Sequence, residues 1–84
     1  GVRISPRIGD HDFNIRVERA KKFLERGDKV KVELVLRGRE KAHVGLAMNQ
    51  VRRFVKAVKE LYEIRIEQDV TKQGNRITSI IARV

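Results

Sequence analysis

The sequence predicts an α+β fold in which two helices pack on one face of a four-stranded sheet. Two segments place apolar residues at helical spacing, four segments are typical of strands, and together they follow the order β-α-β-α-β-β. Because strand–helix–strand crossovers are right-handed, both helices should cover the same face and leave the other face open, as a two-layer α/β sandwich. The chain has 84 residues, which suits a single domain over residues 1–84.

The first strand and the first helix are predicted from residues 2–26. Val2 and Ile4 alternate with polar neighbours until Pro6 ends the strand. The helix is expected over residues 12–26, with an aspartate of the preceding residues 9–12 as its N-cap. Its buried face at 3.6 spacing consists of Phe13, Val17, Ala20 and Leu24, with Phe23 at the border.

The second strand and the second helix are predicted from residues 29–61. Residues 29–37 alternate, and one face consists of Val30, Val32, Leu34 and Leu36. Gly38 permits a tight exit from the strand, and a longer helix is expected over residues 40–61. The core stripe of that helix consists of Val44, Ala47, Met48, Val51, Val55, Val58 and Tyr62.

The last two strands are predicted to form a hairpin. The third strand covers residues 64–70, residues 71–75 form the turn, and the fourth strand covers residues 76–84. The inward face of the fourth strand stays open at this point. Two sets of residues compete for it: Ile80, Ala82 and Val84 on one side, Ile77 and Ile81 on the other.

The charge balance indicates a polyanionic partner. The chain carries 20 Lys and Arg against 11 Asp and Glu, a net charge of +9, with a pI of about 10.7. Nucleic acid is the commonest partner of such a chain, and RNA is the one we expect. An anionic membrane surface is the second candidate, but no strongly amphipathic segment lacks another role. The alternative without a partner is a basic protein kept soluble by its charge.

Other features of the composition exclude several classes of protein. The chain has no cysteine, which excludes disulfides and thiolate metal sites and fits a reducing compartment. Its longest apolar runs, such as residues 34–36, are far shorter than the roughly 20 residues of a membrane span. No signal peptide is visible. The chain begins at Gly1 without a methionine, so we expect it to be part of a longer protein.

Basic residues gather on the predicted outer faces of the helices. On the first helix they are Arg16, Arg19, Lys22 and Arg26; on the second they are Lys41, Arg52, Arg53, Lys56 and Lys59; Arg37 and Arg39 flank Gly38. Any one of them could simply be a solvated charge. However, the second helix has four basic residues between Arg52 and Lys59 with no acid among them, whereas salt-bridge decoration would alternate signs. Such a pattern favours phosphate contacts.

Sequence motifs for catalysis are absent. His11 lies between Asp10 and Asp12, a trio that could bind a metal or move protons, but the capping of the helix accounts for the aspartates. We expect His43 to pack or cap rather than catalyse. There is no phosphate-binding glycine loop and no nucleophile motif, so we predict no enzyme, no cofactor and no metal. Most of the few aromatic residues have core positions, which favours recognition of RNA backbone and shape over base stacking.

Three blocks of sequence resemble a known family. They are Asp-His-Asp-Phe at 10–13, Lys-Phe-Leu-Glu-Arg-Gly-Asp-Lys at 22–29, and Arg-Gly-Arg-Glu-Lys-Ala-His at 37–43. In this order, and over nearly the whole chain, they resemble the C-terminal domain of bacterial translation initiation factor 3. The resemblance implies the same order of elements and a mixed sheet with strand order 1-2-4-3.

The resemblance also implies a function without catalysis. It implies binding of the small ribosomal subunit through its rRNA near the peptidyl site, prevention of subunit association, and support for selection of initiator tRNA and start codon. Small-subunit ribosomal proteins are further implied partners, and we expect a monomer in the bacterial cytoplasm, an organelle being the other possible origin. The basic residues of the family pattern match Arg16, Lys22, Arg37, Arg39, Arg53 and Arg76.

The sequence departs from the family pattern at several positions. Ser5 and Glu18 stand where family members often have a basic residue. Ala47 stands where family members often have a glycine, and this chain has a glycine two residues earlier, at Gly45. The RNA-binding set that we predict combines basic residues on the outer faces of the helices with basic residues that match the family. This set consists of Arg16, Arg19, Lys22, Arg37, Arg39, Lys41, Arg52, Arg53, Lys56 and Arg76.

Three other functions remain compatible with this sequence. A different ribosome- or RNA-binding module on the same fold would bind RNA but would not keep the subunits apart. A small enzyme acting on a phosphorylated substrate could use the Arg37-Gly38-Arg39 turn as an anion cradle, but it would need a nucleophile or base with a positioned partner. A protein-interaction module could use the open sheet face, and its binding would resist salt.

Overall fold

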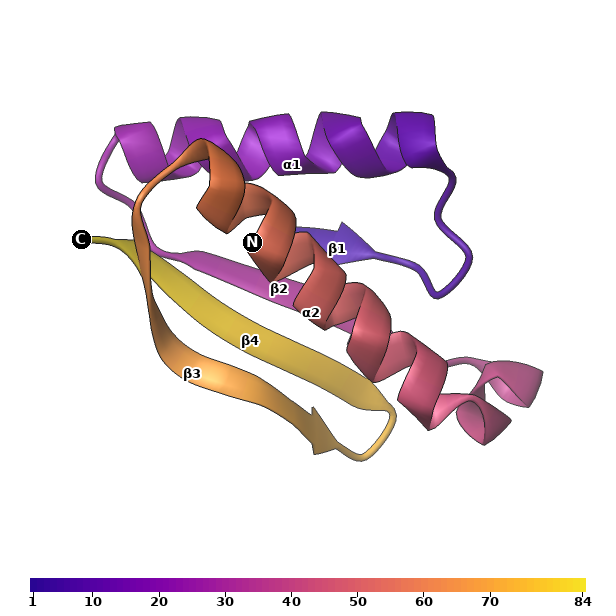
Figure 1. The fold of residues 1–84 in the computed structure, drawn as a ribbon. Helices are drawn as coiled ribbons and strands as arrows, with labels where there is room; N and C mark the ends of the chain where they lie inside the picture. The colour runs from indigo at the N-terminus through magenta and orange to yellow at the C-terminus, as the bar shows by residue number, and fades with distance from the viewer.

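The computed structural model describes residues 1–84 and has two layers, with both helices on one face of the sheet (Figure 1). The strands lie in the order β1-β2-β4-β3; β1 is parallel to β2, and the other pairs are antiparallel. The predicted fold class and strand order are confirmed. The elements are β1 (Val2–Ile4), α1 (Asp10–Glu25), β2 (Val30–Val35), the 3₁₀ helix η1 (Gly38–Ala42), α2 (Val44–Leu61), β3 (Ile64–Gln73) and β4 (Arg76–Arg83).

The core lies between the two layers and is built from the predicted apolar faces. Val30, Val32 and Leu34 of β2 are buried under the helices, as the strand period requires. The stripe of α1 is buried as predicted. On α2, Phe54 joins the predicted stripe and is fully buried, with its ring centroid 5.7 Å from that of Phe13 in an edge-to-face arrangement. This aromatic pair joins the two helices across the core.

The pairing of β4 with β2 settles which face of β4 points inward. Ile77 pairs with Leu34 and Ile81 with Val30, so both isoleucines lie on the helix side and are fully buried. Ile80 is half-buried on the other face, and Val84 lies beyond the strand and is 72% exposed. Register with a neighbouring strand, rather than apolar content, therefore chose between the two competing faces.

The first helix begins earlier than predicted. Its N-cap is Gly9, and no side chain makes a capping hydrogen bond, so the prediction of an aspartate N-cap was wrong. Asp10 and Asp12 instead lie in the first turn of α1, where a negative charge is stabilised by the positive end of the helix. Aspartates do lie at the start of the helix, as predicted, but they lie inside its first turn because the helix begins at Asp10 rather than at residue 12.

The second predicted helix is divided in two. Residues Gly38–Ala42 form η1, in which the backbone N–H groups of Glu40 and His43 donate to the carbonyl oxygens three residues earlier. The chain leaves helical geometry at His43, which has φ −114° and ψ 47°, and α2 starts at Val44. The expected continuous helix over residues 40–61 was therefore wrong at its start. His43 occupies the N-cap position of α2, but its side chain is exposed and makes no cap.

The hairpin is longer and less regular than predicted. Strand β3 extends to Gln73, so the turn is made by Gly74 and Asn75 alone. The register of β3 with β4 shifts twice, between Ile66 and Gln68 and again before Thr71. These irregularities disturb the period of two, and Ile66 is 46% exposed rather than in the core.

Candidate nucleic-acid interface

Most basic side chains lack an acidic partner. Seven of the 20 Lys and Arg side chains lie within 4.0 Å of a carboxylate oxygen, which leaves 13 without an ion pair. The two groups are unequally placed in the fold. The unpaired cations include the outward residues of both helices, whereas four of the seven paired ones lie on or beside the open face of the sheet. The layers therefore differ in how strongly they attract a polyanion.

Arg52, Lys56 and Lys59 form what we call the α2 ridge. The three residues are spaced by four and three positions, lie along one flank of the helix, and are exposed. Arg52 donates a hydrogen bond to Asn49 Oδ1 at 3.3 Å, and none of the three forms an ion pair. The α2 ridge borders a groove of about 590 Å³ between α2 and β3, which also contains Glu60 and Asp69.

On α1 the outward basic residues are Arg19 and Lys22. They line a shallow hollow with His11, Glu18 and the half-exposed Ile15. Neither basic side chain forms an ion pair, although Glu18 lies in the same hollow. The structure thus leaves both predicted residues free for a ligand.

Arg53 lies between the two helices and has partners within the fold. Its Nη2 is 3.3 Å from Oδ1 of Asp10, and its guanidinium carbon lies 4.2 Å from the centroid of the Phe13 ring. Both partners belong to α1, about 40 positions earlier in the sequence. A cation–π contact and an ion pair therefore give Arg53 a structural role. The sequence pattern around Arg53 does not show this role, because both partners are distant in sequence.

The corner after β2 presents further unpaired basic residues. Arg39 and Lys41 on η1 are exposed and form no ion pair. Gly38 makes the corner possible because its φ is +53°, a region that side-chain-bearing residues rarely adopt. Arg37, just before it, joins Arg16 of α1 in lining a hollow at the carboxyl ends of β1 and β2.

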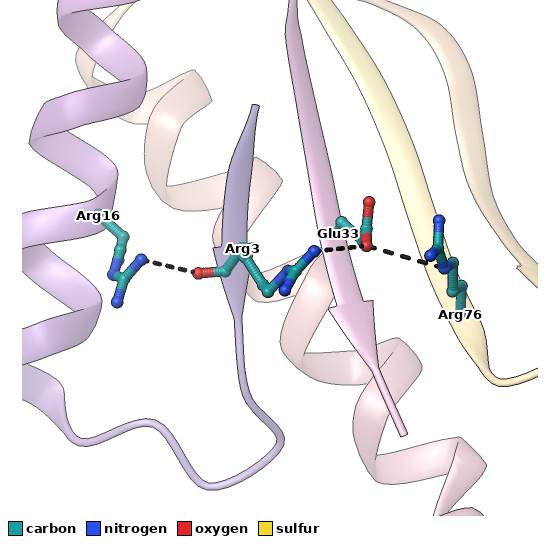
Figure 2. A network of polar contacts seen from close by, with 4 residues as sticks. All are labelled: Arg3, Arg16, Glu33 and Arg76. Atoms are coloured by element: carbon teal, nitrogen blue, oxygen red, sulfur yellow. Dashed lines mark hydrogen bonds and ion pairs between the residues drawn. The ribbon is translucent and has the colours of Figure 1, made fainter. Parts of the chain in front are cut away.

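Arg76 lies on the opposite side of the molecule from the helices. Its Nε is 3.9 Å from Oε1 of Glu33, which also accepts a hydrogen bond of 3.4 Å from Arg3 (Figure 2). Seen from this side, α2 lies behind the sheet (Figure 2). The ten predicted residues therefore do not share one face: Arg76 is separated from the helix ridges by the whole sheet.

A second acid-centred cluster neutralises more of the open face. Glu67 Oε2 is 2.8 Å from Nζ of Lys29, and Glu67 Oε1 is 2.9 Å from a guanidinium nitrogen of Arg65. Hydrogen bonds from Lys29 first, and from Arg65 second, hold the pKa of Glu67 below its ordinary value of 4.5. The glutamate is therefore ionised and balances the charge around it.

Two basic residues near the predicted set were missed by the sequence analysis. Arg3 and Arg7 line the same hollow as Arg16 and Arg37. The signal available in the sequence was a basic residue directly after Pro6, in the loop that joins a strand to a helix. Such loops meet at the carboxyl edge of parallel strands, where ligands often bind.

The surroundings of the two histidines bear on the trio of residues 10–12. No three His, Asp or Glu side chains come together in a way that could hold a metal ion. His11 is exposed in the first turn of α1, beside Asp10 and Asp12.

Neither helix is long and apolar enough to cross a membrane.

Comparison with known proteins identifies the family. Residues 1–84 match the family described as translation initiation factor IF-3, C-terminal domain. The chain is 41% identical over 81 residues to translation initiation factor IF-3 of Caldanaerobacter subterraneus subsp. tengcongensis, covering 96% of this chain and 44% of the relative. It is 52% identical over 59 residues to the Leptospira biflexa factor, covering 70% of this chain and 32% of the relative.

A more distant relative matches the same region. The factor of Bradyrhizobium diazoefficiens is 33% identical over 81 residues, again 96% of this chain and 44% of the relative. The chain thus spans less than half the length of the curated relatives that it matches. With the family match over every residue, and with a two-layer fold of the predicted strand order, the chain belongs to the family of IF-3 C-terminal domains.

Proposed function

We propose that this chain is the ribosome-binding domain of a translation initiation factor. It binds the small ribosomal subunit through rRNA near the peptidyl site, keeps the large subunit from joining, and supports selection of initiator tRNA and start codon. Its partners are the small-subunit rRNA and, beside it, small-subunit ribosomal proteins and initiator tRNA. It works as a monomer without a cofactor and without catalysis, in the bacterial cytoplasm.

The observation that carries this proposal is the unpaired charge on the helix side. Each cation without a carboxylate partner can contact a phosphate without first breaking an ion pair. The α2 ridge, Arg19 and Lys22 on α1, and Arg39 and Lys41 on η1 are all of this kind. Guanidinium groups pair with phosphate oxygens in a bidentate way, so the arginines are the stronger anchors. No exposed aromatic platform accompanies them, which favours recognition of backbone and shape.

The mechanism that follows is steric. A domain held on folded rRNA by many phosphate contacts occupies surface that the large subunit would need. The strength of such binding depends on ionic strength, because each phosphate that is neutralised releases counterions. The family membership supplies the ribosome as the source of the RNA.

The test is subunit association measured by light scattering with purified ribosomal subunits. The 84-residue chain should keep subunits apart at low salt and lose the effect at high salt. A variant with Arg52→Gln and Lys56→Gln should bind small subunits at least about tenfold more weakly, since it removes two charged groups that pair with phosphates. The matched control, Lys31→Gln with Arg65→Gln, removes the same charge from the open sheet face and should bind nearly as well.

The outcomes separate the alternatives. If small subunits bind the chain but still join large subunits, the domain is an RNA-binding module of another kind. If the control variant weakens binding as much as the α2 variant, only net charge matters and the ridge is not the interface. If binding resists salt, a protein partner on the open sheet face replaces RNA.

A further inference from the structure

A hollow of about 500 Å³ lies where β1 and β2 end and α1 begins. The two strands are parallel, so their carboxyl ends meet at one edge of the sheet, and the loop of residues 5–9 and the start of η1 close the hollow on two sides. Twelve residues line the hollow, and they come from β1, the loop after it, α1, the end of β2 and the start of η1.

Four arginines contribute to this one hollow. Arg16 donates a hydrogen bond from Nη1 to the carbonyl oxygen of Arg3 at 3.1 Å, and Arg3 in turn contacts Glu33 on the sheet (Figure 2). Arg7 and Arg37 are exposed and form no ion pair. These two guanidinium groups, on the loop after β1 and at the start of η1, have all their donors available to a ligand.

The charge in the hollow is positive although it includes two carboxylates. Asp12 and Glu40 oppose the four arginines. One oxygen of Glu40 is already occupied, because it accepts a hydrogen bond of 3.0 Å from the backbone N–H of Arg37. The excess of guanidinium groups favours an anion over a cation, and a planar fork of donors fits phosphate oxygens.

The walls are fixed before any ligand binds. Gln50 of α2 donates a hydrogen bond of 2.9 Å from Nε2 to the carbonyl oxygen of Pro6, which ties the loop to the helix layer. Within the loop, the backbone N–H of Ile8 donates to the carbonyl oxygen of Ser5 at 3.2 Å. A loop held at both points loses little entropy when a ligand binds, so the hollow is largely preformed.

The size of the hollow and its apolar lining indicate more than a phosphate group. Ile8 and Val35, both half-buried, contribute apolar surface beside the arginines, whereas Ile4 and Pro6 are buried. Ligand pockets of roughly 300–1,000 Å³ accept small organic molecules, and this hollow lies within that range. An apolar surface next to an oxoanion site fits the sugar or base that carries the phosphate.

We infer that this hollow binds one nucleotide, with its phosphate on Arg7 and Arg37 and its sugar or base against Ile8 and Val35. The inference rests on the proposed function only for the source of the nucleotide. If the chain binds rRNA, the nucleotide is an unstacked residue of that RNA strand rather than a free nucleotide. It adds a specific pocket at the strand ends to an interface otherwise made of exposed cations on helices.

The experiment is an NMR titration of the ¹⁵N-labelled 84-residue chain with three probes: inorganic phosphate, adenosine 5′-monophosphate, and a short single-stranded oligoribonucleotide without terminal phosphates. Shifts of the amides of residues 7–9 and 37–40 that saturate with the nucleotide, and more weakly with phosphate, are expected. Tighter binding of the oligoribonucleotide at the same amides identifies a chain nucleotide as the occupant, whereas tighter binding of adenosine 5′-monophosphate overturns that source.

A matched pair of variants tests the arginines directly. Arg7→Gln with Arg37→Gln should weaken nucleotide binding by about tenfold or more, since both guanidinium groups that pair with the phosphate are removed. Lys31→Gln with Lys72→Gln removes the same charge elsewhere and should change the affinity by less than about twofold. Equal weakening by both pairs, or shifts spread over the helices without saturation at the hollow, overturns the inference.

The result is independent of the ribosome experiment. Binding of small subunits with no nucleotide effect at residues 7–9 and 37–40 rejects the pocket while leaving the proposed function in place. Saturable nucleotide binding at the hollow by a chain that ignores ribosomal subunits rejects the proposed function and assigns the hollow to a free nucleotide.

Discussion

Gly38 is the residue on which the corner between β2 and η1 depends. Its φ of +53° lies in the left-handed region, which costs other L-residues about 1–2 kcal/mol. An added Cβ would meet no atom within 4 Å, so the cost of a side chain there is conformational and not steric. We expect Gly38→Ala to lower the free energy of unfolding by about 1 kcal/mol, measured by urea unfolding followed by circular dichroism.

Gly45 provides the matched control for this substitution. It lies in the first turn of α2, its φ is not positive, and an added Cβ would also meet no atom within 4 Å. Gly45→Ala should therefore raise the free energy of unfolding by about 0.4–1 kcal/mol, because alanine restricts the unfolded chain. Equal effects of the two substitutions would show that the corner does not require left-handed backbone.

Arg53, at the same scale, is a predicted RNA contact that also has a structural role. Its contact with the Phe13 ring and its ion pair with Asp10 join α2 to α1. The Arg53 side chain is 50% exposed and that of Asp10 is 89% exposed, so the ion pair stabilises the fold only modestly, and the ring contact adds about 0.5–1 kcal/mol. A loss of RNA binding in an Arg53 variant therefore has to be compared with the loss of stability.

At the scale of elements, Glu67 links β3 to the residue just before β2. Lys29 and Glu67 meet at 2.8 Å although β4 lies between β2 and β3 in the sheet. The pKa of Glu67 is lowered in the folded state by Lys29 first and Arg65 second. A carboxylate whose pKa is lowered by folding stabilises the fold above its unfolded pKa, and loses that effect as the pH falls through the folded pKa.

A pH titration of stability tests this link. The difference in unfolding free energy between the wild type and Glu67→Gln should be largest at about pH 6, and it should shrink as the pH falls through the lowered pKa of Glu67 in the folded state. The control is Glu63→Gln, because Glu63 is exposed and forms no ion pair. A Glu67→Gln difference that stays constant over this range would contradict the lowered pKa.

At the scale of the whole molecule, the two layers differ in charge neutralisation. Glutamates on the open face hold Arg3, Arg76, Lys29 and Arg65, whereas the helix layer keeps most of its basic residues unpaired. If RNA lies on the helix layer and about six phosphates are neutralised, log K should fall against log salt with a slope of about −4 to −5.

Variants should change this slope in a way that depends on the layer. The double variant Arg52→Gln and Lys56→Gln should reduce the magnitude of the slope by about two, because two phosphates are no longer neutralised. The control variant on the open face, Lys31→Gln with Arg65→Gln, should leave it nearly unchanged. Fluorescence anisotropy of labelled rRNA fragments over a series of salt concentrations measures both. Equal slopes for the two variants would mean that the RNA contacts both layers alike.

Much of this fold could be predicted because its elements are encoded locally. The apolar stripes of α1 and α2 and the alternation in β2 follow the periods of 3.6 and 2, and each predicted stripe packs into the core. The same local rules failed where two geometries compete closely. The start of α2 was wrong because a 3₁₀ turn over Gly38–Ala42 satisfies the backbone as a helix would, and β3 was misjudged because its register shifts interrupt the alternation.

The sequence predicted which kind of residue makes up the candidate site, but it did not predict how these residues are arranged in space. Arg19, Lys22, Arg52 and Lys56 lie exposed on the helices, as helical spacing requires. Arg76 lies on the far face because its position in β4 is opposite Val35, and that pairing depends on the register of two strands distant in sequence. The arginines of the hollow come from β1, its following loop, α1 and the residue just before η1, and no local pattern brings them together.

The sequence by itself determined the order of elements, the buried faces of the helices, the excess of positive charge and the family resemblance. These properties depend on neighbours within a few positions along the chain or on composition alone. Only the tertiary structure decided which face of β4 points inward, which cations have acidic partners, and that four arginines line one hollow. The physical reason is that strand register and helix packing are set by the collective burial of the core, so contacts across many positions arise only when the whole chain has folded.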